Sequence, residues 1–164
     1  MTGLVVPQTL RGFRDILPDE MNLRNYVIEK IRAVYERYGY VPIDTPILEQ
    51  RSTLLGTGGE EADKQIFFLD TPEKQRAGLR FDLTVPFARI IAQYHPNDIK
   101  LPFRRYHIGP VFRADDPQPE QGRFRQFTQF DIDVAGTSSV AADAEIIAAM
   151  SDAMQAVGLT DDPN

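Results

Sequence analysis

The sequence predicts an α+β fold in which an antiparallel sheet is flanked by helices. Two strand-like segments, 103–115 and 122–136, are separated by a polar connector that contains two prolines, which indicates a long hairpin. Apolar residues at three- and four-residue spacing in 18–40 and after Gly136 indicate two helices, one before and one after the hairpin in the chain. With 164 residues, 42% of them hydrophobic and 26% charged, the chain fits one globular domain with one core.

Two long helices are predicted, one near each end of the chain. In the first, acidic residues open the helix, Gly39 closes it, and one stripe holds Leu23, Val27, Ile31, Val34, Tyr35 and Tyr38. In the second, which ends before Gly158, the apolar stripe holds Val140, Ala144, Ile147, Ala148, Met154 and Val157. The last five residues, TDDPN, are expected to add no further element.

Shorter elements are predicted between the first helix and the hairpin. Residues 40–49 hold two prolines among β-formers, which favours an irregular or edge strand. Residues 50–63 are glycine-rich and are expected to form a loop. Segments 66–70 and 76–82 are expected to be strands around a turn. Thr84 is then expected to cap a short helix.

The composition argues against several kinds of site. The chain has no cysteine and two histidines, so we expect no disulfide, no thiolate catalysis and no metal-binding residues. The net charge of −6 lacks the basic field of a non-specific nucleic-acid binder. Charged residues interrupt the first thirty positions, and no apolar run is long enough to span a membrane, so a cytoplasmic protein without a membrane partner is expected.

Arginine is concentrated in one part of the chain. Of the 18 basic residues 14 are arginine, and five of these lie between 104 and 125: Arg104, Arg105, Arg113, Arg123 and Arg125. The planar guanidinium fork suits phosphate and carboxylate, so the cluster suggests an anionic ligand. A solvated strand edge that carries arginines is the alternative.

Residues alternate between two faces along the second hairpin strand. The even face is rich in apolar residues and is expected to pack on the core: Phe124, Gln126, Thr128, Phe130, Ile132 and Val134. The odd face is expected to line a ligand groove: Arg123, Arg125, Phe127, Gln129, Asp131 and Asp133. A hairpin centred near Pro119 would place Arg113 beside Arg125, with Asp115 on the face of Arg113. An aromatic ring between arginines suits a nucleotide. An ordinary exposed sheet face is the alternative.

These segments resemble class II aminoacyl-tRNA synthetases, in the form found in the histidyl-tRNA synthetase family. The stretch GPVFRADDPQPEQGRFRQFTQFDIDVAG resembles their motif 2, and GYVPIDTPILEQ resembles motif 1. TLRGFRDILPDE is similar to the N-terminal signature, and LRFDLTVPFARIIA to the start of the amino-acid pocket. Asp115 and Asp116 stand where many bacterial members have Glu and Arg, and Thr128 where they have His. The short Asp115 is usual in the eukaryote-like branch.

The resemblance implies a histidine–tRNA ligase. Such an enzyme uses ATP, with Mg²⁺, to activate histidine to histidyl-adenylate, and then transfers the histidyl group to tRNA(His). It implies that Arg113 is the catalytic residue, contacting both the α-phosphate and the amino-acid carboxylate. The implied ATP-binding residues are Arg113, Asp115, Arg123 and Phe127, with adenine stacked on Phe127 and the γ-phosphate side held by Arg123.

The resemblance also implies a histidine pocket and a homodimer. The implied histidine-binding residues are Asp82, Thr84, Arg113, Gln129 and Asp133, where Asp133 accepts a hydrogen bond from the imidazole. For Asp82 the alternative is a carboxylate that stabilises a helix N-terminus. Tyr38, Gly39 and Pro46 are implied at the dimer interface, with plain core and turn positions as the alternative. His107 is expected to be a strand residue and not a catalyst.

The family's third motif and its anticodon-binding domain are not found before Asn164. We therefore expect residues 1–164 to be the N-terminal portion of a catalytic domain, a partial class II fold that is inactive or very weak alone. One rival function is the synthetase-like regulatory subunit of ATP phosphoribosyltransferase in histidine biosynthesis. Arg113, Gln129 and the RFDLT segment favour the synthetase. A second rival, a stand-alone nucleotide- or RNA-binding module, predicts a basic excess that the net charge does not show.

Overall fold

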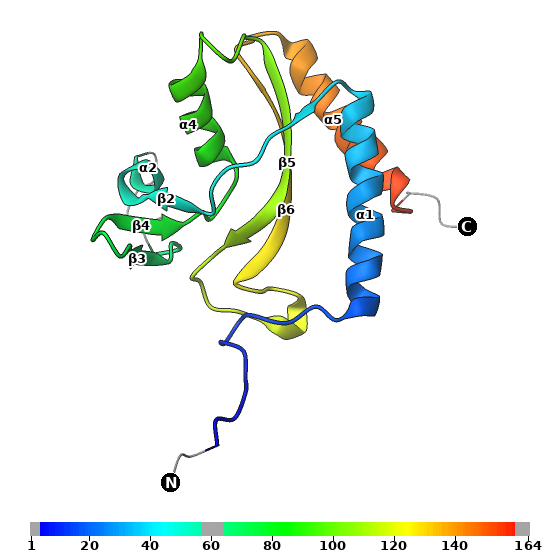
Figure 1. Ribbon diagram of the computed structural model, residues 1–164. Coiled ribbons are helices and arrows are strands. Elements are labelled where there is room, and N and C mark those ends of the chain that lie inside the picture. Colours follow the sequence, from blue (N-terminus) through cyan, green and yellow to red (C-terminus); the bar gives the residue numbers. More distant parts are fainter. Residues whose placement is uncertain (1–3, 57–63, 160–164) are drawn as a thin grey trace.

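A long antiparallel hairpin forms the centre of the computed structural model, which describes residues 4–56 and 64–159 (Figure 1). Its strands are β5 (Phe103–Phe112) and β6 (Gln126–Ala135). The short strand β1 (Val41–Pro42) pairs in parallel with β5, which gives the order β1-β5-β6. Within the described residues β6 is therefore paired on one side only.

The register of the hairpin confirms the predicted centre near Pro119. Phe112 lies opposite Gln126, and the ladder continues as Arg113 N–H donates to the Arg125 carbonyl at 2.8 Å. The connector contains one turn of 3₁₀-helix, Pro119–Gln121, closed by Gly122 in a left-handed conformation. Arg113 and Arg125 are therefore neighbours, as the sequence predicts.

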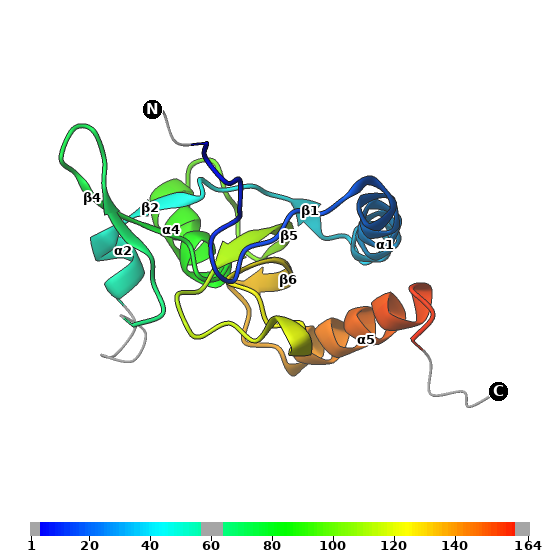
Figure 2. The same cartoon turned by 90° about the horizontal axis from the view of Figure 1, so that it is seen from below.

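Two helices cover one face of the hairpin (Figures 1 and 2). They are α1 (Pro18–Arg37) and α5 (Val140–Ala156), and both were predicted. The core between helices and hairpin is formed by Val34, Tyr35, Tyr40, Tyr106, Ala149 and Ala153. Phe130, Ile132 and Val134 pack against it, which confirms that the even face of β6 points to the core. The described residues form no helix that is both long and apolar enough to cross a bilayer.

The buried face of α5 differs from the predicted stripe. Val140, Ile147 and Met154 are 77%, 68% and 49% exposed, whereas Ala149 and Ala153 are buried against α1. Because α5 is apolar around most of its circumference, spacing alone does not identify its packing face. Ile146 packs against the same core, so the buried stripe of α5 is a different one from the predicted stripe. Leu23, which was predicted on the buried stripe of α1, is also 63% exposed.

A second sheet lies on the other side of the hairpin together with helix α4 (Figure 1). It has the order β2-β4-β3 and is antiparallel, with strands β2 (Leu48–Gln50), β4 (Arg76–Leu79) and β3 (Phe68–Asp70). The break between β1 and β2 confirms an irregular strand at 40–49. Helix α4 spans Thr84–Tyr94.

Two local predictions are corrected. Residues 50–63 were expected to form a loop, but helix α2 (Arg51–Leu55) lies in this segment, with Leu54 fully buried. Residues 57–63 lie outside the described residues, as does the expected terminal segment 160–164. Thr84 does not cap α4 but is its first residue. Leu83 is the N-cap residue, and Asp82 before it supplies the side-chain acceptor, since its Oδ1 accepts a hydrogen bond from Val85 N–H at 3.1 Å.

Candidate active site

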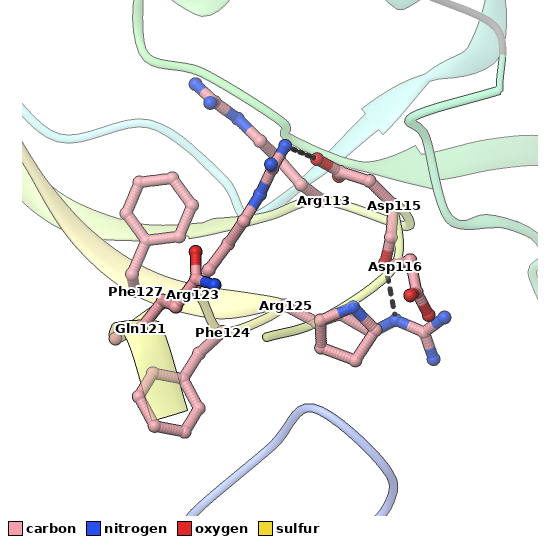
Figure 3. A pocket seen from close by; sticks show the side chains of 10 residues that line it. Arg113, Asp115, Asp116, Gln121, Arg123, Phe124, Arg125 and Phe127 are labelled. Atoms are coloured by element: carbon pink, nitrogen blue, oxygen red, sulfur yellow. Dashed lines mark hydrogen bonds and ion pairs between the residues drawn. The ribbon is translucent and has the colours of Figure 1, made fainter. Parts of the chain in front are cut away.

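All four residues predicted to bind ATP line one cavity at the connector end of the hairpin (Figure 3). The cavity has a volume of about 270 Å³. Its lining comprises Arg113, Asp115, Asp116, Pro117, Gln121, Gly122, Arg123, Phe124, Arg125 and Phe127. The fold thus brings together cationic forks and aromatic rings, the groups that suit a nucleotide.

Asp115 is held from both sides in this cavity. The Nη2 atom of Arg123 lies 2.7 Å from its Oδ2, and Figure 3 shows the side chain of Arg123 extended toward it. Arg125 Nε donates to the backbone carbonyl of Asp115 at 3.0 Å. Arg125 therefore fixes the backbone of the connector, whereas Arg123 is more than half exposed and can exchange its carboxylate partner for a phosphate.

Arg113 connects this cavity to the segment that precedes α4. Its Nε donates to the Phe81 carbonyl at 3.2 Å, and its guanidinium lies 5.1 Å from the centre of the Phe127 ring. Its hydrogen bonds within the described residues use Nε alone, so the two Nη atoms remain as donors for an anion. Asp82 follows Phe81 directly, and burial raises the pKa of its carboxyl.

The N-terminal segment packs against the connector that lines the cavity. Arg125 N–H donates to the Gly12 carbonyl at 2.8 Å, and Arg11 pairs with Asp116 at the same distance. A Cβ on Gly12 would lie 2.9 Å from atoms of Arg125 and Pro117, and its φ of +82° favours glycine. The family resemblance includes this segment, but the sequence does not predict its contact with the connector.

Three of the predicted histidine-binding residues line a second cavity, which runs along the unpaired edge of β6. They are Thr84, Gln129 and Asp133, and the cavity has a volume of about 410 Å³. Its remaining lining includes Asp131 and apolar residues of α1 and α5. Gln129 Nε2 donates to both carboxylate oxygens of Asp131, at 2.9 and 3.1 Å.

Asp133 makes an ion pair with Arg105, a side chain that is fully buried beneath it. Burial raises the pKa of the Asp133 carboxyl, and the charge of Arg105 acts in the opposite direction. Sequence reasoning counted Arg105 only as a member of the arginine cluster. The register of the predicted hairpin could have indicated this ion pair, because it places Arg105 directly opposite Asp133.

The arginine cluster does not serve one ligand. Arg113, Arg123 and Arg125 line the first cavity, but Arg104 points away and lies 3.0 Å from the carboxylate of Glu145 on α5. Arg105 is buried against Asp131 and Asp133. The anionic ligand stays a prediction, and it now concerns the three arginines that line the first cavity.

The residues implied at a dimer interface lie near the C-terminus of α1 and between β1 and β2. Tyr38 donates from its hydroxyl to Asp152 Oδ2 at 3.0 Å, so it also links α1 to α5. Gly39 has a φ of +80° after the helix end, and Pro46 is exposed. Ile47 and Leu48 beside it are 40% and 45% exposed, which leaves apolar surface on this segment.

Two expectations remain, one for His107 and one for Mg²⁺. His107 lies buried on β5, and its Nε2 is 3.0 Å from Asp44 Oδ1, which suits the predicted structural role. The described residues form no cluster of three His, Asp or Glu side chains that could hold an ion. A Mg²⁺ ion that arrives with ATP is commonly held by phosphate oxygens and few protein ligands, so it needs no such cluster.

Comparison with known proteins is consistent with this geometry. The family model described as histidyl-tRNA synthetase matches residues 12–162. The histidine–tRNA ligase of Rhodopirellula baltica is 42% identical over 156 residues, which cover 95% of this chain but 35% of that protein. The chain thus spans about a third of the length of the curated relatives it matches.

Solved structures share the fold. Histidyl-tRNA synthetase from Nostoc sp. PCC 7120 matches with a TM-score of 0.77 and 39% identity, covering 91% of this chain and 34% of that one. A Bacillus halodurans protein described as an ATP phosphoribosyltransferase regulatory subunit/histidyl-tRNA synthetase matches with a TM-score of 0.83 and 27% identity, covering 98% and 40%. The motifs, the two cavities and these matches together show that the chain belongs to the histidyl-tRNA synthetase family.

Proposed function

We propose that this chain supplies the ATP- and histidine-binding residues of a histidine–tRNA ligase, which forms histidyl-adenylate from histidine and ATP and transfers the histidyl group to tRNA(His). One observation carries the proposal: Arg113 lines the first cavity and is hydrogen-bonded to Phe81, beside Asp82. A single guanidinium can therefore contact the α-phosphate of ATP and the carboxylate of histidine at once.

The reaction needs positioned charge and no nucleophilic side chain. A carboxylate oxygen of histidine attacks the α-phosphorus, the bond to the leaving oxygen breaks, and pyrophosphate departs. Negative charge grows on the phosphate oxygens, where the Nη atoms of Arg113 stabilise it. Phe127 stacks on adenine, Asp115 positions the adenine end, and Arg123 leaves Asp115 to bind the γ-phosphate side.

The second cavity supplies the amino-acid contacts in this proposal. Asp82, Thr84 and Gln129 hold the α-ammonium, and Asp133 accepts a hydrogen bond from the imidazole N–H. Support comes from their common location, since Thr84, Gln129 and Asp133 line one cavity. Asp133→Asn keeps the shape but removes the charge, so it should weaken histidine binding far more than ATP binding.

The wider assembly is also part of the proposal. Motifs 1 and 2 lie in residues 1–164, and a third motif with a further arginine completes the site in the active enzyme. Without that arginine, few donors remain for the phosphate charge, so the 164-residue chain alone should be inactive or very weak. The proposal also includes a cytoplasmic homodimer, in which two copies of the enzyme contact each other through Tyr38, Gly39 and Pro46.

A second candidate is a regulatory subunit of ATP phosphoribosyltransferase. The specific observation that favours it is the Bacillus halodurans neighbour, whose description names both functions and whose TM-score is 0.83. Such a protein would keep a histidine pocket without activating histidine. Arg113 and the Phe127 ring beside it favour the ligase, because adenylate formation needs them and histidine sensing does not.

The test is histidine-dependent exchange of labelled pyrophosphate into ATP. The assay protein is a chimera in which this chain replaces the matching segment of the Rhodopirellula baltica relative, and the 164-residue chain is assayed beside it. We expect exchange by the chimera only with histidine, and little or none by the chain alone. A folded chimera that binds histidine but gives no exchange would favour the regulatory subunit instead.

A further inference from the structure

Arg105 is a buried cation that the proposed reaction does not use. It lies on β5, is 0% exposed, and faces the same side of the hairpin as Gln129, Asp131 and Asp133. Its Nη2 pairs with Asp133 and lies 3.7 Å from Asp131 Oδ2. A side chain this long and charged is rarely buried unless its partners compensate the loss of hydration.

The same guanidinium also reaches the other wall of the histidine pocket. Nη2 donates to the Leu83 carbonyl at 3.1 Å, and Leu83 lies between Asp82 and Thr84. The guanidinium carbon lies 4.5 Å from the centre of the Phe87 ring on α4. Arg105 thus connects the β6 carboxylates to the segment that carries Asp82 and Thr84.

The connection is charged and directional. Asp131 and Asp133 lie two residues apart on one face, so without a cation between them their carboxylates would repel each other in a buried setting. Arg105 balances part of that charge, and its planar guanidinium fixes the direction of the N–H bonds on Nη2. Its Nε and Nη1 atoms are buried and make no hydrogen bond within the described residues, so Nη2 alone makes these polar contacts.

We propose that Arg105 is a positioning residue for amino-acid specificity, which holds the Asp133 carboxylate and the 82–84 segment where an imidazole-bearing amino acid can meet both. The inference rests on the proposed function, because it assigns Arg105 to the histidine half of that site. Arg105 touches no substrate; it acts through Asp133 and Leu83. Loss of Arg105 should therefore weaken histidine binding and leave ATP binding, which uses the other cavity, unchanged.

The test is a nuclear magnetic resonance titration of the isotope-labelled 164-residue chain with histidine and, separately, with ATP. Arg105→Met removes the charge and keeps much of the length, and Arg105→Lys keeps the charge but not the fork. We expect Arg105→Met to raise the Kd for histidine by about ten-fold or more, since a displaced charged acceptor loses a charge-assisted hydrogen bond. Arg105→Lys should lie between it and the unsubstituted chain.

A carboxyl titration tests the electrostatic link between Arg105 and Asp133 on which the inference depends. Two charged groups face the Asp133 carboxyl: Arg105 on β5, and Asp131 on the same strand as Asp133. Arg105 also faces Asp82. Removal of the cation should raise the pKa of the Asp133 carboxyl further. Arg104→Met is the matched control, because Arg104 is the adjacent arginine on the opposite face and pairs with Glu145; it should change neither affinity nor this pKa.

The outcomes separate this inference from the proposed function. Histidine binding by Arg105→Met at the affinity of the unsubstituted chain would overturn the inference alone, as would equal losses for histidine and ATP. If Arg105→Met fails to fold, Arg105→Lys decides: a selective loss of histidine affinity supports the inference, and normal affinity refutes it. An unsubstituted chain that binds ATP but not histidine would refute the proposed pocket and the inference together.

Discussion

The guanidinium of Arg80 donates to both the carbonyl oxygen and the hydroxyl of Thr45, at 2.7 and 3.1 Å. Its Nε also donates to the Pro110 carbonyl on β5, at 2.8 Å. This side chain is 1% exposed and joins the segment between β1 and β2 to the hairpin. Because Phe81 and Asp82 follow Arg80 directly, these bonds fix the segment to which Arg113 is hydrogen-bonded.

Replacing Arg80 should destabilise the chain. Arg80→Met leaves the Thr45 and Pro110 carbonyls without their buried donor, which should lower the free energy of unfolding by about 3 kcal/mol or more. Urea denaturation followed by circular dichroism measures the change. Arg76→Met is the control, since Arg76 is an exposed arginine at the start of β4, four residues before Arg80, and its replacement should cost little. Equal losses in the two variants would contradict the account.

Gly12 should tolerate a side chain less well than another glycine with the same backbone conformation. Gly12 and Gly158 have φ of +82° and +87°, but a Cβ meets nothing within 4 Å at Gly158 and lies 2.9 Å from Arg125 and Pro117 at Gly12. Both alanine variants pay about 1 kcal/mol for the left-handed conformation. Gly12→Ala should lose clearly more in thermal denaturation, and should also weaken ATP binding. Matching losses would refute a close contact between Gly12 and the connector.

Arg113→Ala should abolish most of the pyrophosphate exchange of the chimera. Its Nη atoms are proposed to meet charge that grows in the transition state, and loss of one such donor costs on the order of 10²–10³ in rate. Arg32→Ala, an exposed arginine on α1, is the control and should leave the rate unchanged. Near-normal exchange by Arg113→Ala would remove this residue from the reaction.

His107 should make the chain less stable in mild acid. Burial, and next the charge of Arg80, lower the pKa of His107 below its usual 6.5, whereas Asp44 and its hydrogen bond act in the opposite direction. The unfolded chain then binds more protons than the folded chain as pH falls below about 6.5, so the free energy of unfolding decreases toward the folded pKa. His107→Gln should show a smaller decrease between pH 7.5 and 5.5.

His95→Gln is the control for this pH dependence, because His95 is exposed after α4. It should retain the decrease seen in the unsubstituted chain. The raised pKa values of Asp82 and Asp133 act in the opposite direction, and they are common to all three proteins. An identical slope for His107→Gln and the unsubstituted chain would contradict the assignment to His107.

The hairpin could be predicted from the sequence because strand alternation and a central connector are local properties. They placed Arg113 beside Arg125 and the even face of β6 on the core. The packing face of α5 could not be predicted, since this helix carries more than one apolar stripe with helical spacing and the buried one contains the small residues Ala149 and Ala153. The contacts of Arg80 and Gly12 join segments far apart in the chain, for which single-sequence periodicity carries no signal.

The candidate site likewise has a part that could be predicted from the sequence and a part that could not. Parity and the family resemblance selected ATP- and histidine-binding residues that, apart from Asp82, the fold gathers into two cavities. They did not distinguish arginines that face a ligand from Arg105, whose partners are carboxylates of the protein itself. That distinction depends on burial, which for Arg105 comes from contacts with Leu83 and with Phe87 on α4.

The central claim is that one guanidinium, that of Arg113, lies between an ATP cavity and a histidine cavity. A crystal structure of the chimera with a sulfamoyl analogue of histidyl-adenylate tests it most directly, because this unreactive molecule fills both halves of the site at once. We expect the sulfamoyl group on Arg113, adenine stacked on Phe127, and the imidazole hydrogen-bonded to Asp133. Binding of the analogue with its imidazole away from β6, or with Arg113 turned from the sulfamoyl group, would contradict the account.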